Sequence, residues 1–154
     1  MLPVPFDWHV FLGIAAKIAF AYALAVPTGW WREKQGHAIG IRTFPIVAMA
    51  SCGYMLIFGD VKGTEGLTLN SHILQGLVAG IGFIGGGAIV RDGTSVHGTA
   101  TAASIWNTGA IGAAVAMGRN EVAVILALLN ILTLEALIPV KRHLDSGPGD
   151  TGNQ

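Results

Sequence analysis

The chain has 154 residues, of which 52% are hydrophobic and 12% are charged, and its mean hydropathy is +0.59. Because soluble domains carry about 25% charged residues, this composition excludes an ordinary soluble domain and favours a polytopic membrane protein. The formal net charge of zero gives no electrostatic basis for a nucleic-acid partner, and the single cysteine, Cys52, excludes an intrachain disulfide.

Five apolar segments are predicted to cross the membrane as helices. They cover residues 8–26, 44–59, 72–90, 99–117 and 121–140, and most approach the ~20 residues that a spanning helix needs. The expected fold class is therefore all-α, a polytopic membrane protein with about five transmembrane helices. Residues 1–144 should form one transmembrane domain, and the polar residues 145–154 are expected to be a disordered tail.

The first span is expected to be retained rather than cleaved as a signal peptide. No basic residue precedes Lys17, and Lys17 interrupts the apolar core that a signal peptide requires. The positive-inside rule then orients the chain. Basic residues are concentrated in the first and third linkers and after the last span, which predicts an outer N-terminus and a cytoplasmic C-terminus (Arg32, Lys34, Arg42, Arg91, Lys141, Arg142).

Two ionisable residues lie well inside the predicted spans, Lys17 in the first and Glu135 in the last. At 1.5 Å per residue, Lys17 lies roughly 13 Å and Glu135 roughly 21 Å below the outer face. One interpretation is structural: the two side chains form an ion pair, or Glu135 meets the basic cytoplasmic border. The other is functional: a charge that holds a ligand or carries protons.

The first linker supplies a second group of candidate residues, at the predicted cytoplasmic surface. Arg42 and Thr43 begin the second span, and Arg32 and Glu33 lie in the first linker. Arg42 is expected either to contact lipid headgroups or to latch onto a carboxylate with its rigid fork of donors. The carboxylates in the same layer are Glu33 and Asp92 of the third linker.

The third span is unusually rich in glycine between Gln75 and Val90. A literal G-x-G-x-x-G occurs at positions 80–85, but no strand is predicted before it and no acid follows about 20 residues on, so dinucleotide binding is rejected. In lipid, glycine lets a neighbouring helix approach closely, and the run 85–87 either stays helical or breaks the helix. Gln75 is a polar candidate near the outer end. The predicted packing glycines are Gly76, Gly80, Gly82, Gly85, Gly86 and Gly87.

The fourth span has small side chains at every fourth residue, which places them on one helix face: Ser104, Thr108, Gly112 and Ala116. This face predicts either an antiparallel hairpin with the third span or the seam of a homodimer, because a small-residue face does not identify the chain that it meets. Asn107 and Thr108, with Asn130 in the fifth span, are expected to form interhelical hydrogen bonds or to contact a ligand.

The polar residues show no pattern of a metal centre or of a catalytic site. The five histidines occur without metal-ligand spacing, and the serines show no evident His–acid arrangement. We therefore expect no enzyme activity and no cofactor, and the sequence does not identify a metal.

Several segments together resemble the MgtC/SapB family. The segment GWWRE at 29–33 and the segment GIRT at 40–43 resemble its first cytoplasmic loop, and GIGFIGGGAI at 80–89 is similar to its glycine-rich segment. Residues 96–112, with Val96, Gly98, Thr101, Trp106 and Gly112 in register, resemble a third block. The sequence departs from the family where Trp31 replaces the first acid of an E-R-E motif and where Thr99 and Ala100 replace Leu-Thr.

The resemblance implies a multi-pass protein of the bacterial inner membrane, in a short form without the C-terminal cytoplasmic domain of longer members. It also implies a link to growth at low Mg2+, to virulence in some pathogens, and to control of other membrane proteins such as ATP synthase. The implied partners are membrane lipid, other inner-membrane proteins and a second copy of the chain.

Three functions follow as hypotheses. The first is a membrane-embedded regulator that acts through helix contacts with partner membrane proteins. The second is a transporter or channel for Mg2+ or another ion, as an oligomer. Mg2+ sites use carboxylates and retained waters, whereas Glu135 is the one acid deep in the predicted spans and Lys17 would repel the cation. The third is an anion site built from Lys17 or Arg42 and a broken third helix.

Overall fold

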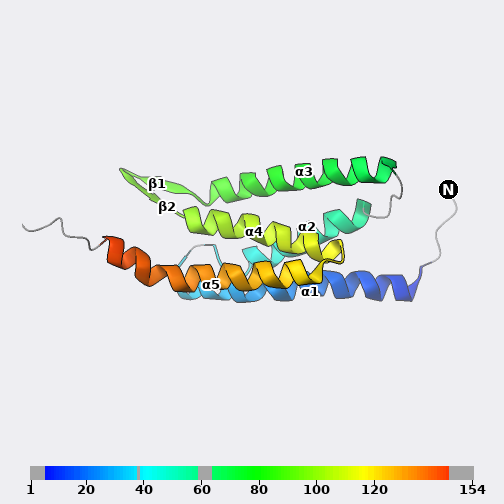
Figure 1. Ribbon diagram of the computed structural model, residues 1–154, viewed down its shortest axis with the longest axis horizontal. Coiled ribbons are helices and arrows are strands. Elements are labelled where there is room, and N and C mark those ends of the chain that lie inside the picture. Colours follow the sequence, from blue (N-terminus) through cyan, green and yellow to red (C-terminus); the bar gives the residue numbers. More distant parts are fainter. Residues whose placement is uncertain (1–5, 38, 59–63, 146–154) are drawn as a thin grey trace, which may run out of the picture.

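The computed structural model describes residues 6–37, 39–58 and 64–145, so the predicted tail lies almost entirely outside the described residues. Five helices run lengthwise beside one another (Figure 1). The all-α prediction is confirmed, with one addition, a hairpin of two short strands. The elements are α1 (Trp8–Lys34), α2 (Thr43–Phe58), α3 (Thr64–Gly87), β1 (Val90–Asp92), β2 (Ser95–His97), α4 (Thr99–Ala116) and α5 (Asn120–Asp145).

Among the described residues, two helices are both long and apolar enough to cross a membrane, Trp8–Lys34 and residues Asn120–Leu137 of α5. In the apolar 18-residue stretch of each helix, only 11% of α1 and 17% of α5 is buried inside the protein. In water such outward apolar faces would form patches far larger than a soluble monomer exposes, so the faces fit a lipid environment. The five-span topology and the side on which each terminus lies stay predictions.

The central helix of the bundle is α4, which packs against each of the other four helices. Small residues permit this. At Gly112 an added Cβ would collide with the backbone oxygen of Ala48 in α2 and lie 2.8 Å from the Cβ of Ser51. Thr108, on the same face, is fully buried. The face predicted at every fourth residue of α4 therefore packs within the chain, against α2 at Gly112 and against α5 at Ser104.

The glycine-rich helix α3 behaves differently. Only at Gly85 would a Cβ come close to a neighbouring helix, 3.2 Å from the carbonyl oxygen of Ala102 in α4. At the other five predicted packing glycines no atom lies within 4 Å of that position: Gly76, Gly80, Gly82, Gly86 and Gly87. The expected α3–α4 hairpin exists, but the structure does not bring these five glycines against another helix of the same chain.

The glycine run ends α3 rather than interrupting it. The helix stops at Gly87, three residues before the predicted end of the span, and a β-hairpin pairs Val90 with His97. Gly93 has a φ of +57° at the first central position of the two-residue turn, as a type II′ turn requires. The sequence analysis did not predict these strands, because three-residue strands carry too little periodicity.

Candidate functional site

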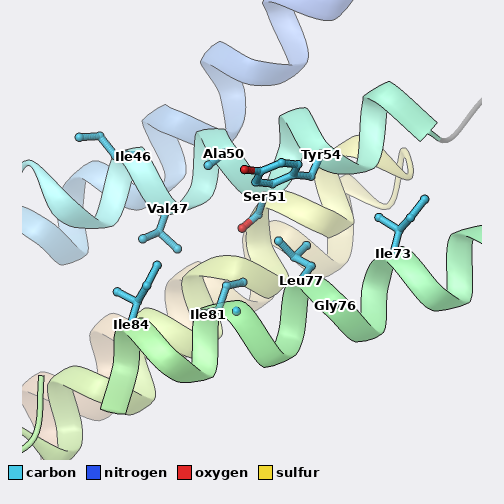
Figure 2. Close-up of a pocket in the computed structure, with 11 residues that line it drawn as sticks. Ile46, Val47, Ala50, Ser51, Tyr54, Ile73, Gly76, Leu77, Ile81 and Ile84 are labelled. Atoms are coloured by element: carbon cyan, nitrogen blue, oxygen red, sulfur yellow. The ribbon is translucent and has the colours of Figure 1, made fainter. Parts of the chain in front are cut away.

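A groove on the side of the bundle lies between α2 and residues 73–84 of α3 (Figure 2). Its volume is about 450 Å³. Branched apolar side chains from both helices converge on it, and two glycines of α3, Gly76 and Gly80, leave part of its wall as bare backbone. The polar groups in the lining belong to Ser51 and Tyr54 of α2. The groove thus combines an apolar surface with a strip of exposed helix backbone.

A second groove, between α1 and α2, has a similar volume of about 460 Å³. Its lining contains Phe11, Ile14, Tyr22 and Met49 but no glycine. A lipid chain can fill either groove, because lipid needs only apolar contact. Close approach of another helix needs small residues. The α1–α2 groove supplies Ala15 and Ala19, but the α2–α3 groove supplies glycines, which have no side chain at all and let a helix approach more closely.

The two ionisable residues of the spans are placed apart from each other. The Lys17 ammonium donates to the carbonyl oxygen of Ala116, at 3.3 Å, near the C-terminal end of α4. There it complements the negative end of the helix dipole. Glu135 is exposed on the outside of the chain. Among the described residues the one ion pair joins Arg119 to Glu121, so the interpretation of Lys17 and Glu135 as a pair is wrong.

Polar side chains connect three helices inside the bundle. The Ser104 hydroxyl donates to Asn130 Oδ1 at 3.1 Å, and Asn130 Nδ2 donates to Thr28 Oγ1 at 3.5 Å, which links α4, α5 and α1. Asn107 Nδ2 donates to the carbonyl of Leu126 at 3.2 Å. Each bond satisfies a polar group that lipid cannot solvate. Thr108 bonds back to the carbonyl of Ser104 within α4, and Gln75 is exposed on α3.

The linker between α1 and α2 is held by Glu33. Its Oε2 atom accepts a hydrogen bond from the backbone amide of Ile41 at 2.9 Å. Gly40 lies directly against this carboxylate, and an added Cβ at Gly29 would lie 2.9 Å from the Cα of Ile41. The GWWRE and GIRT segments therefore pack against each other because two glycines leave space for them.

The predicted latch of Arg42 is not formed. Arg42 and Asp92 are both exposed, and Thr43 begins α2 half-buried. Glu33, the other expected partner, is occupied by the Ile41 amide. In the described part of the chain, the one ion pair joins Arg119 to Glu121. The predicted latch between Arg42 and a carboxylate is therefore wrong.

The buried arginine of the linker is Arg32, which is only 4% exposed. Its Nη2 atom donates to Thr101 Oγ1 in the first turn of α4. Its Nε atom is buried and, within the described residues, has no hydrogen-bond partner. The same holds for Nδ1 of His37, whose backbone amide donates to the Arg32 carbonyl. Burial, and then the nearby charge of Arg32, lower the pKa of His37 below its ordinary value of 6.5.

The lowered pKa of His37 predicts a pH-dependent stability. Between the folded pKa and 6.5 the unfolded chain binds more protons on this ring than the folded protein. The contribution of neutral His37 to the free energy of unfolding is therefore fully present above about pH 6.5, and it is lost as the pH falls from there through the folded pKa. Thermal unfolding in detergent should occur at a lower temperature at pH 5.5 than at pH 7.5, and His37→Asn should reduce this difference. If the unfolding temperature of His37→Asn still falls as much between pH 7.5 and pH 5.5, His37 is not the group responsible.

Sequence reasoning named Arg32 but missed its surroundings. Thr28 and His37 were not predicted as site residues, and Thr101 was named only as part of a motif, although the sequence shows His37 five residues after Arg32. What the pattern could not show is that the first turn of α4 lies against the linker. No three His, Cys, Asp or Glu side chains come together as a metal-holding group in the part of the chain that the structure describes.

Comparison with known proteins gives consistent results. SrpB of Synechococcus elongatus is 31% identical over 147 residues, which cover 88% of this chain and 79% of SrpB. YhiD of Escherichia coli, by its name a proposed magnesium transporter, is 34% identical over 112 residues, which cover 70% of this chain and 52% of YhiD. Protein MgtC of Brucella abortus is 30% identical over 131 residues, which cover 85% of this chain and 53% of MgtC.

The alignments therefore extend over about half the length of YhiD and of MgtC. None of the three names denotes an enzyme. No solved structure matches the chain. The sequence profile of the MgtC family matches residues 18–143, which include all of α2, α3 and α4. On this extent of similarity, the chain belongs to the MgtC family.

Proposed function

We propose that the protein is a membrane-embedded regulator that binds a transmembrane helix of a partner membrane protein in the α2–α3 groove. The observation that carries the proposal is the pair of glycines, Gly76 and Gly80, whose backbone is open to the groove. In lipid, apolar surface alone gives helices no reason to associate, whereas small-x-x-x-small pairs allow backbones to pack closely. Gly76 and Gly80 have this spacing.

The biological setting of the proposal comes from the family. A multi-pass protein of the bacterial inner membrane, with the N-terminus outside and the C-terminus in the cytoplasm, would present this groove to neighbouring inner-membrane proteins. The resemblance to the MgtC/SapB family makes adaptation to low Mg2+ the expected process and ATP synthase a candidate partner. The glycine strip formed by Gly76 and Gly80 would equally allow a helix from a second copy of the chain to bind in the groove.

The second candidate function is Mg2+ transport, which the name of YhiD favours. A Mg2+ path needs carboxylates or other oxygen ligands facing the ion. Glu135 is exposed on the outside of the bundle, and Lys17 caps α4. A transport path through one copy would therefore have to form without either residue facing the bundle interior, so we favour the regulator.

Site-specific photocrosslinking in cells tests the docking proposal. A photoreactive residue at position 73 lies in the α2–α3 groove, and one at position 14 lies in the glycine-free groove between α1 and α2. We expect a discrete adduct with one membrane protein from Ile73 and only lipid adducts from Ile14. An adduct of two identical chains would assign the groove to self-association. Lipid adducts alone from both positions would contradict docking.

A further inference from the structure

The first turn of α4 lacks every usual source of negative charge. The amides at the start of an α-helix have no acceptor within the helix, and the cap residue, Gly98, has no side chain to supply one. Gly98 cannot be exchanged for a capping serine, because its φ is +86° and a Cβ would collide with the carbonyl of Ala88. The first turn also contains no acidic residue.

A buried cation lies against this same turn. Arg32 is 4% exposed, its guanidinium contacts Thr101, and its Nε atom has no partner among the described residues. Burying a guanidinium without a counter-charge is strongly unfavourable, and the positive end of the α4 dipole adds to the cost. Nδ1 of His37, beside Arg32, is likewise buried without a partner among the described residues. The Arg32 guanidinium and the positive end of the α4 dipole therefore meet at the first turn of α4, with no negative group beside them among the described residues.

We propose that this end of the bundle binds a phosphate group, held by the Arg32 guanidinium and the first-turn amides of α4. Phosphate matches the planar fork of arginine and is the usual anion at helix N-termini. Thr99 and Ala100, the first two residues of α4, are exposed, so a phosphate group can approach this end of the helix from outside the bundle. The phosphate can come from a lipid headgroup or from soluble phosphate, because the site lies where the topology prediction puts the cytoplasmic surface.

The test measures thermal unfolding of the full chain in a phosphate-free maltoside detergent. One arm adds inorganic phosphate at constant ionic strength, with chloride as the control anion. The other arm adds micelles doped with phosphatidic acid, with diacylglycerol as the control lipid. We expect a saturable rise in unfolding temperature in at least one arm and none with the controls. The responding arm identifies the source of the phosphate, and no saturable rise in either arm overturns the proposal.

Substitutions connect the response to the site. Arg32→Gln should weaken the apparent affinity at least tenfold, because charge-assisted bonds to the guanidinium are lost. Arg91→Gln changes an exposed arginine of the hairpin that precedes α4 and should keep the wild-type affinity. Should Arg32→Gln not fold, Arg32→Lys keeps the charge but loses the fork and should bind several-fold more weakly. Wild-type affinity in the folded Arg32 variant overturns the proposal.

Discussion

Replacing Gly112 by alanine is expected to destabilise the bundle by about 2 kcal/mol. Alanine favours a helix over glycine by about 1 kcal/mol, but its Cβ would collide with the backbone oxygen of Ala48 and lie 2.8 Å from Ser51 Cβ. A backbone atom cannot move without its helix, so α2 and α4 must separate. Overpacking of this kind costs about 1–3 kcal/mol or occasionally more, and here it exceeds the gain in helix propensity.

The matched control is Gly82→Ala in α3, where no atom lies within 4 Å of the new Cβ. This variant should be as stable as the wild type or more stable by up to about 1 kcal/mol. Unfolding in detergent with increasing denaturant, followed by circular dichroism, measures both. Equal stability of the two variants would show that α2 and α4 do not approach each other as closely as described.

Filling the α2–α3 groove is expected to abolish partner binding while the fold survives. In Gly76→Leu/Gly80→Leu the new side chains enter space that is open in the wild type, so the interior of the bundle is not overpacked. They also remove the bare backbone that a docking helix needs. The adduct from the photoreactive residue at Ile73 should fall at least tenfold, which corresponds to about 1.4 kcal/mol.

Gly82→Leu separates loss of the groove from a general effect of leucine in α3. Gly82 is open like the other two glycines but does not line the groove. This variant should retain the adduct, and all variants should reach the membrane in similar amounts. An adduct that persists in the double variant would exclude the glycine strip as the contact surface.

The helices of this protein were largely predictable because their cause is local. Long apolar runs in the sequence correspond to α1, α2 and α5 within a few residues, except that α1 extends to Lys34, well beyond the predicted end at 26. The small face around Gly112 followed from helical spacing alone. The ends of α3 were less predictable: its start at Thr64 and its stop at Gly87 depend on turn geometry and on the hairpin that follows.

The pairing of polar groups was not predictable, because it depends on which helices are neighbours. Lys17 and Glu135 were predicted at depths close enough for an ion pair, yet α4 ends beside Lys17 and supplies the carbonyl of Ala116 instead. Arg42 and Arg32 look equivalent in the sequence, but only Arg32 is covered by α4. The glycines of α3 were read as packing residues, and the structure leaves most of them open. Tertiary contacts decided each case.

The regulator proposal and the transport alternative differ most in what the protein does with Mg2+ when no partner is present. The purified chain reconstituted in liposomes that contain a Mg2+-sensitive dye measures this directly. If the protein acts through its groove, uptake of Mg2+ should equal that of empty vesicles over the full range of external concentrations. Saturable Mg2+ uptake that disappears in Glu135→Gln would contradict the account.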